Sequence, residues 1–140
     1  MQTAQQKFKK LLKDHQEYHE EAYNFIYEAL DRAQKMYRGR LEKRREPYVT
    51  ARELLEGFRL HAIDQFGCLA LTVLNAWGVK KTSDVGDIVF NLVDYDLMGK
   101  REEDTRKKFD NVYEFSKVFN LQPFFYEEEK RGGGCRYIQR

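Results

Sequence analysis

Two histidines stand four residues apart near the start of the chain, at His15 and His19. On one helix, this spacing would place both imidazoles on the same face, where they could bind a metal ion. His19 directly precedes Glu20 and a new helical pattern, so we place it at the start of a helix, away from His15. No third ligand follows nearby, and we predict neither a metal site nor a cofactor.

The densest group of cations consists of Arg38, Arg40, Lys43, Arg44 and Arg45. Pro47 disfavours helix at the residue before it, so a loop is expected from residue 38 to residue 47. Side chains of this kind could contact phosphate or an acidic partner. We favour a solvated basic loop and keep the binding role as its alternative.

A third group is expected on one face of a single helix. Phe90 falls opposite the apolar stripe of that helix, together with Asp87, Asn91 and Asp94. An outward phenylalanine among acids is a candidate contact for a protein partner. Alternatively, Phe90 packs under the long helix expected at residues 20–38. We take these four residues as candidate binding residues.

Three helices between Thr50 and Leu97 must position these groups. Thr50 and Glu53 fit a capping box at the start of the first helix, and Gly67 is a natural stop for it. The second helix, Cys68–Trp77, is apolar almost all round, which indicates burial on several sides. Thr82 or Ser83 is expected to cap the third helix, with the charge of Asp84 in its first turn. The shared core is predicted to contain Leu71, Leu74, Trp77, Ile88, Val89 and Leu92.

The remaining segments complete the predicted fold. Helices are expected at residues 3–14 and 20–38, and an aromatic segment at residues 112–119 should fold back onto the core. Residues 98–109 favour no single structure, and a charged loop, a short helix and a small β-hairpin stay open. We predict an all-α fold, a compact bundle of five or six helices in one domain over residues 1–120. The hairpin after the fourth helix would make the core winged-helix-like, and residues 121–140 would be a partly flexible tail.

Charge and cysteine usage limit the function classes. The formal net charge of +2 gives no global electrostatic reason to bind nucleic acid or acidic membranes. No apolar run approaches eighteen residues and the N-terminus lacks a signal-peptide core, so no membrane contact is expected. Cys68 and Cys135 make no disulfide framework, and Cys68 is expected to be a small core residue. A reducing, cytoplasmic setting fits best.

Long blocks of the sequence carry a resemblance. These blocks are Glu53–Gly67, Leu69–Phe109 and, upstream, Ala22–Leu30. Taken in order, they resemble a family of small uncharacterised proteins of planctomycete and verrucomicrobial bacteria over residues 5–120. The resemblance does not extend to the basic loop or the tail. It implies a common fold and brings no activity and no catalytic residues.

Three function classes stay open. The favoured one is a non-enzymatic protein-interaction or regulatory module with an unknown protein partner, supported by the aromatic surface at Phe90. A winged helix-turn-helix nucleic-acid-binding protein is the first alternative, because three helices with short turns match that layout. It is disfavoured, because a recognition helix needs basic or amide side chains, whereas this one carries Asp84, Asp87 and Asp94.

An enzyme of unknown class is the second alternative. Acids are plentiful, but the sequence has no Gly-rich phosphate loop, no nucleophile elbow and no Cys–His arrangement in a predicted context. His61 is expected on the polar side of its helix, in contact with water.

Overall fold

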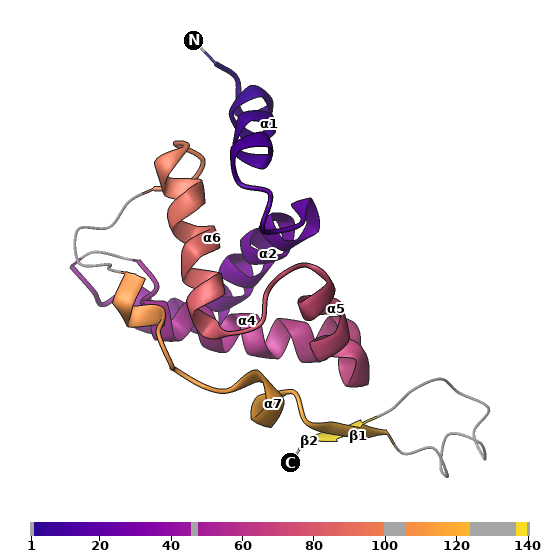
Figure 1. Cartoon of the computed structure of the whole chain (residues 1–140). Coiled ribbons are helices and arrows are strands. Elements are labelled where there is room, and N and C mark those ends of the chain that lie inside the picture. The colour runs from indigo at the N-terminus through magenta and orange to yellow at the C-terminus, as the bar shows by residue number, and fades with distance from the viewer. Residues whose placement is uncertain (1, 46–47, 100–105, 124–136, 140) are drawn as a thin grey trace.

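In the computed structural model, two long helices, α2 (Glu20–Met36) and α4 (Ala51–Phe66), cross at the centre of the molecule (Figure 1). Their contact is the most extensive between any two elements described. Gly57 allows this close approach, because a Cβ there would lie 2.9 Å from both the Ala29 carbonyl oxygen and the Ala33 Cβ. The pair forms the base on which the other helices pack.

The structure describes residues 2–45, 48–99, 106–123 and 137–139. Within them, five α-helices have seven or more residues and two have four, so the predicted all-α class is confirmed. No helix in these ranges is both long enough and apolar enough to cross a membrane. The elements besides α2 and α4 are α1 (Ala4–Asp14), α3 (Arg38–Leu41), the 3-10 helix η1 (Gly67–Leu69), α5 (Ala70–Ala76), α6 (Thr82–Asp94), the 3-10 helix η2 (Arg106–Phe109), α7 (Phe115–Val118), β1 (Leu121–Pro123) and β2 (Tyr137–Gln139).

The hydrophobic core lies where α2, α4 and α6 meet, and α5, η2 and α7 close it. Phe58 of α4 lies at its centre, with its ring edge-on to Phe25 at 5.5 Å and stacked on Phe115 at 6.0 Å between centroids. Phe115 and Phe119 are buried, which confirms that the aromatic segment folds back onto the core. Four members of the predicted core are buried, namely Leu74, Ile88, Val89 and Leu92.

The helix α5 is less buried than predicted. Leu71 and Trp77 are only partly buried, and Leu69 is 57% exposed in the preceding 3-10 turn. Cys68, in the same turn, is partly exposed and disulfide-bonded, which corrects its expected role as a small core residue. The sequence pattern overestimated burial here because α5 is a short helix at the edge of the molecule, packed chiefly on α4 (Figure 1).

The start and stop signals of α4 are confirmed. Thr50 Oγ1 accepts from the Glu53 N–H at 3.2 Å, and Glu53 Oε1 accepts from the Thr50 N–H at 2.9 Å. Gly67 ends the helix with a φ of +51°. The predicted cap of α6 is wrong: neither Thr82 nor Ser83 caps it.

Lys81 is the N-cap residue of α6, and Asp84 lies in the first turn, as predicted. The Asp84 Oδ2 accepts from the backbone N–H groups of Lys80 at 2.8 Å and of Lys81 at 3.2 Å. Thr82 is buried, and its hydroxyl accepts from the Val112 N–H at 3.3 Å. This bond ties the segment after η2 to the start of α6.

Of the three structures left open for residues 98–109, the small β-hairpin is not found in the part of this segment that the structure describes. Met98 and Gly99 are not strand, η2 is a 3-10 helix, and residues 100–105 lie outside the described ranges. The ring of Phe109 explains the position of η2, because it is buried against Gly86, where a Cβ would approach the Phe109 Cβ to 2.7 Å. The winged-helix-like core is therefore not supported.

The two short strands lie in the predicted tail. β1 pairs antiparallel with β2, with Leu121 opposite Gln139 and Pro123 opposite Tyr137. The division into a domain over residues 1–120 and a partly flexible tail over 121–140 stays a prediction. Residues 124–136 and 140 of that tail lie outside the described ranges.

Candidate functional site

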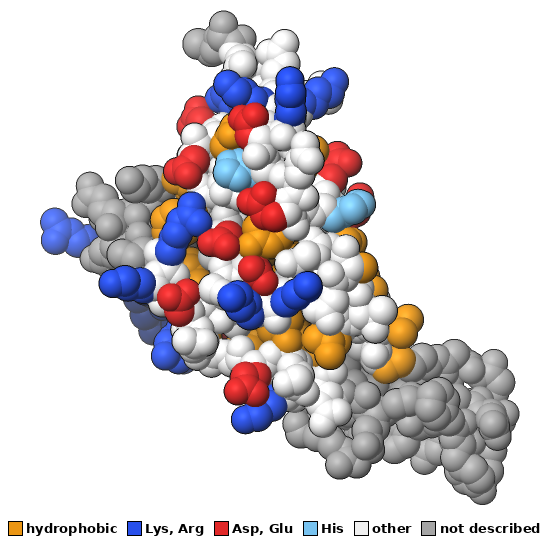
Figure 2. Space-filling model, in the orientation of Figure 1, with side chains coloured by type: hydrophobic (Ala, Val, Ile, Leu, Met, Phe, Trp, Pro, Cys, Tyr) orange, Lys and Arg blue, Asp and Glu red, His pale blue; other side chains and the backbone are white. Residues whose placement is uncertain are grey.

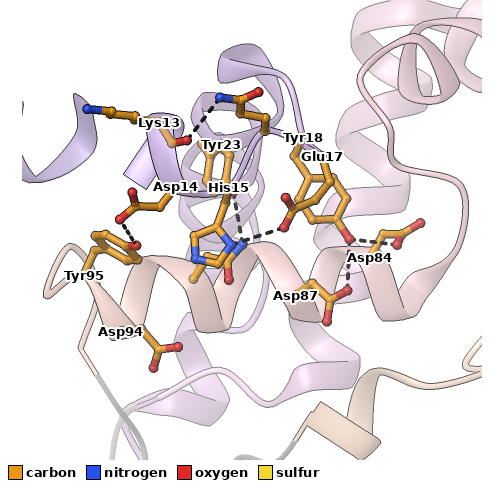
Figure 3. A network of polar contacts seen from close by, with 12 residues as sticks. Lys13, Asp14, His15, Glu17, Tyr18, Tyr23, Asp84, Asp87, Asp94 and Tyr95 are labelled. Carbon is orange, nitrogen blue, oxygen red and sulfur yellow. Dashed lines mark hydrogen bonds and ion pairs between the residues drawn. The ribbon is translucent and has the colours of Figure 1, made fainter. Parts of the chain in front are cut away.

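The acids predicted on the outer face of α6 have partners within the chain. Figure 3 shows the Tyr18 side chain pointing between Asp84 and Asp87. Its hydroxyl lies 2.8 Å from Asp84 Oδ1 and 3.0 Å from Asp87 Oδ2, and its single proton can be donated to one of them at a time. Burial and, after it, the hydrogen bond to Asp84 raise the pKa of Tyr18, so the phenol stays protonated.

Arg106, from η2, neutralises much of the remaining negative charge on α6. Its Nη1 donates to Asp87 Oδ1 at 2.9 Å, and its Nη2 lies 3.9 Å from Asp94 Oδ2. The same guanidinium lies over the Phe90 ring, 5.3 Å from its centroid. Asp87 and Asp94 are therefore parts of an internal network and are not free acids awaiting a partner.

Two of the predicted binding residues lie elsewhere than expected. Asn91 is 4% exposed, and its Nδ2 donates to the Tyr23 hydroxyl at 3.1 Å, so its predicted place on the outer face is wrong. Phe90 is partly buried, with its ring edge-on to Phe109 at 6.3 Å. Asn91 turns toward the core because it follows Ile88 by one helical turn.

Phe90 forms one wall of an apolar cavity of about 170 Å³, here named the Phe90 groove. This volume lies below the roughly 300–1,000 Å³ of typical small-molecule sites. It is close to the roughly 150 Å³ of an engineered cavity that holds benzene, so it suits one ring-sized side chain. Tyr48 lines it and is itself 53% exposed. The lining residues are Leu30, Gln34, Tyr48, Val49, Leu54, Val89, Phe90, Val93, Met98 and Gly99.

The predicted basic loop contains a helical turn, α3, beside this groove. Leu41 of α3 is buried in a small second core with Val49 and Ala33, and Leu30 packs against it. Because Val49 and Leu30 also line the groove, α3 is its immediate neighbour. The prediction of a loop was wrong here because the buried Leu41 anchors the turn.

Four of the five predicted basic residues are exposed, and one is structural. Arg44 is partly buried and holds both carboxylate oxygens of Glu53, at 2.7 and 2.5 Å, while its Nη1 also donates to the Tyr48 carbonyl at 3.1 Å. The other four have no carboxylate partner within the ranges that the structure describes. They are Arg38, Arg40, Lys43 and Arg45.

The Arg44–Glu53 pair predicts a pH dependence of stability. The hydrogen bond from Arg44 lowers the pKa of Glu53 from 4.5 to about 2. Because the folded pKa is the lower one, the stabilisation is fully present above pH 4.5 and is lost as the pH falls toward 2. We expect Glu53→Gln to lower the Tm at pH 7 and the difference from wild type to shrink between pH 4.5 and 2 in thermal melts. Glu42→Gln, at an exposed position, is the control, and a constant difference down to pH 2 would contradict the assignment.

His61, expected in water, is 8% exposed and lies in a polar chain between α2 and α4. Arg32 Nε donates to His61 Nδ1 at 3.1 Å, so Nδ1 is unprotonated and the proton is on Nε2, which donates to Glu28 Oε1 at 3.0 Å. The ring also packs on Phe25, with centroids 4.8 Å apart. Both nitrogens are engaged, so the imidazole links two helices and is not poised as a base. Its spacing from Phe58 and Leu54, three and seven residues, was the signal that pointed to the core.

The histidine pair at the N-terminal end is separated as expected. His19 caps α2, and its Nδ1 accepts from the Glu21 N–H at 3.0 Å. His15 lies between α1 and α2, with its Nδ1 3.3 Å from Glu17 Oε1 and its ring edge-on to the Tyr95 ring. No group of three His, Cys, Asp or Glu side chains within the described residues could hold a metal ion.

A scan against protein-family models and searches of curated proteins and of solved structures find no match to this chain. The resemblance of residues 5–120 to the bacterial family named above stays a prediction. Function is therefore inferred from the Phe90 groove and its surroundings. Sequence reasoning named Phe90 and the neighbouring cations, but it missed the other groove residues and the partners Tyr18 and Arg106.

Proposed function

We propose that this chain is a non-enzymatic protein-interaction module that captures one bulky apolar side chain of a partner in the Phe90 groove. The observation that supports this most is the ring-sized apolar cavity whose wall Phe90 forms. Buried aromatic or aliphatic anchors in such pockets supply much of the energy of protein–protein contacts. Asp87 and Asp94 contribute indirectly, because they hold Arg106 over the Phe90 ring.

The partner segment is proposed to be acidic around its apolar anchor. Support comes from Arg38, Lys43 and Arg45, which are exposed and have no carboxylate partner within the described residues. They lie on or next to α3. Leu41 of α3 packs against Val49, and Val49 also lines the groove. Charge complementarity of this kind raises the rate of association and selects among partners.

Duplex DNA is the less favoured partner. A recognition helix must donate to phosphates and base edges. The helix α6 contains no Lys or Arg, and its Asn91 is buried. On the face seen in Figure 2, Lys and Arg side chains alternate with Asp and Glu side chains, and hydrophobic side chains are visible between them.

The proposal is tested by selecting random displayed peptides on the full chain. We expect enriched peptides to share one aromatic or large aliphatic residue flanked by Asp or Glu. Val93→Trp, which fills the groove, should weaken their binding by about tenfold or more. Leu69→Trp, at the exposed residue before α5, is the matched control and should leave binding unchanged.

Two further points make this test decisive. Gln34→Trp covers the groove from an exposed position and serves as a second blocking variant if Val93→Trp lowers stability. Thermal melts of each variant establish that it is folded. Peptides that bind both blocked variants as tightly as wild type would overturn the proposal, as would a selection in which no common pattern emerges.

A further inference from the structure

We propose a second binding site, for a phosphate monoester attached to a planar group, in a pocket formed by α3, the start of α4 and the residues after η2. The pocket is here named the arginine pocket, and its volume of about 430 Å³ lies within the roughly 300–1,000 Å³ range of small-molecule sites. Its lining residues are Tyr37, Arg40, Arg52, Glu53, Glu56, Val112 and Tyr113.

The two glutamates of the pocket are already neutralised from outside it. Glu53 is held through both carboxylate oxygens by Arg44. Glu56 is held in the same way by Arg59, from Nε at 3.1 Å and from Nη2 at 2.5 Å. Fork-to-fork pairs of this kind are among the strongest ionic contacts in proteins. Neither carboxylate is therefore left to neutralise the cations that line the pocket.

Those cations are Arg40 and Arg52. Both are exposed, and neither has a carboxylate partner in the part of the chain that the structure describes. Among the residues that the structure describes, the pocket thus presents two guanidinium groups without a carboxylate partner. A phosphate monoester carries about −1.5 to −2 charges at pH 7, which matches this excess, whereas a carboxylate carries only one. The planar guanidinium also matches phosphate oxygens in a two-point contact.

Aromatic side chains form the walls of the pocket. The Arg40 guanidinium lies over the Tyr37 ring, 5.6 Å from its centroid, and this contact orients the side chain before a ligand arrives. Tyr113 is fixed by its hydroxyl, which donates to the Leu55 carbonyl at 2.6 Å. These rings offer surface to a planar group that carries the phosphate. An aryl phosphate is the ligand class that satisfies both features.

This site is independent of the Phe90 groove. The cations assigned to the groove are Arg38, Lys43 and Arg45, whereas the arginine pocket uses Arg40 and Arg52. Either proposal can therefore fail while the other stands. The same ligand chemistry occurs in small aryl phosphates and in phosphotyrosyl side chains, which separate probes distinguish.

The test is a calorimetric or NMR titration of the full chain with phenyl phosphate, inorganic phosphate and benzoate. We expect phenyl phosphate to bind at least several-fold more tightly than inorganic phosphate, and benzoate about tenfold more weakly than phenyl phosphate. Binding of phenyl phosphate should weaken from pH 7 to pH 5, because the dianion takes up one proton in this range and becomes a monoanion. A short phosphotyrosine peptide that binds more tightly than phenyl phosphate would assign the natural ligand to a modified protein segment, and the reverse order would assign it to a small molecule.

Variants locate the binding. Arg40→Gln and Arg52→Gln should each weaken phenyl phosphate by about tenfold, whereas Arg38→Gln, exposed on the same short helix, should change it less than about twofold. Arg52→Lys keeps the positive charge but removes the planar guanidinium that makes a two-point contact with phosphate. Its loss of affinity for phenyl phosphate should therefore be smaller than that of Arg52→Gln. No saturable binding of phenyl phosphate would overturn the site. So would equal losses in the Arg38 and Arg40 variants, or duplex DNA binding that depends on both pocket arginines while phenyl phosphate does not bind.

Discussion

Replacing Phe58 by alanine is expected to lower the free energy of unfolding by about 3–5 kcal/mol. Phe58 is 1% exposed and lies between the rings of Phe25 and Phe115, so its removal leaves a cavity that rigid neighbours cannot close. Urea or thermal unfolding measures the loss. Leu60→Ala, at a partly exposed position of the same helix, is the control and should cost much less. A loss for Phe58→Ala under about 1 kcal/mol would show that α4 does not sit at the centre of the core.

Leu74→Ala is expected to cost about 2–5 kcal/mol, because Leu74 is fully buried and fixes α5 onto the core. The same unfolding measurements apply. Leu69 is the matched control, since it is 57% exposed just before the same helix, and its alanine variant should change stability within about 0.5 kcal/mol. Equal losses in the two variants would mean that α5 packs through a different face.

Local signals in the sequence were sufficient to predict a helix start or stop where both partners of the interaction lie within one helical turn. The capping box of Thr50 and Glu53 is such a case, and the stop at Gly67 is another, because a positive φ depends on the residue itself. The cap of α6 was missed although it is also local. Lys81 occupies the N-cap position, Asp84 reaches back to the N–H groups of Lys80 and Lys81, and the hydroxyl of Thr82 accepts from the Val112 N–H instead.

Interactions between distant segments could not be predicted from the sequence. Tyr18 meets Asp87 across 69 residues, and Arg106 reaches the same carboxylate from a segment with no regular pattern. Asn91 and His61 are polar residues whose burial depends on a partner from another helix, Tyr23 and Glu28 respectively. The spacing of both residues from apolar neighbours pointed to the core, but a polar side chain is assigned to the solvent face as long as its partner is unknown.

The candidate site could be predicted only in part, because it too combines segments that are distant in the sequence. Phe90 could be singled out because a phenylalanine stands among acids on one helix. The groove that it lines draws Leu30, Val49 and Met98 from three other segments, and only the folded chain brings them together. The cations beside the groove were visible as a cluster. The cluster alone does not show that Arg44 is structural while its neighbours are exposed, because this follows from the contact between Arg44 and Glu53 in the folded chain.

The most direct test of the central claim, that the Phe90 groove binds a partner's apolar side chain, is a methyl NMR titration of the full chain with a selected acidic peptide. The claim predicts that the methyl signals of Leu30, Val93 and Met98 shift together and saturate with one affinity. Exchanging the peptide's anchor residue for alanine should abolish these shifts. Shifts confined to the surface of η1 and α5, at Leu69 and Leu71, with the groove methyls unchanged, would contradict it.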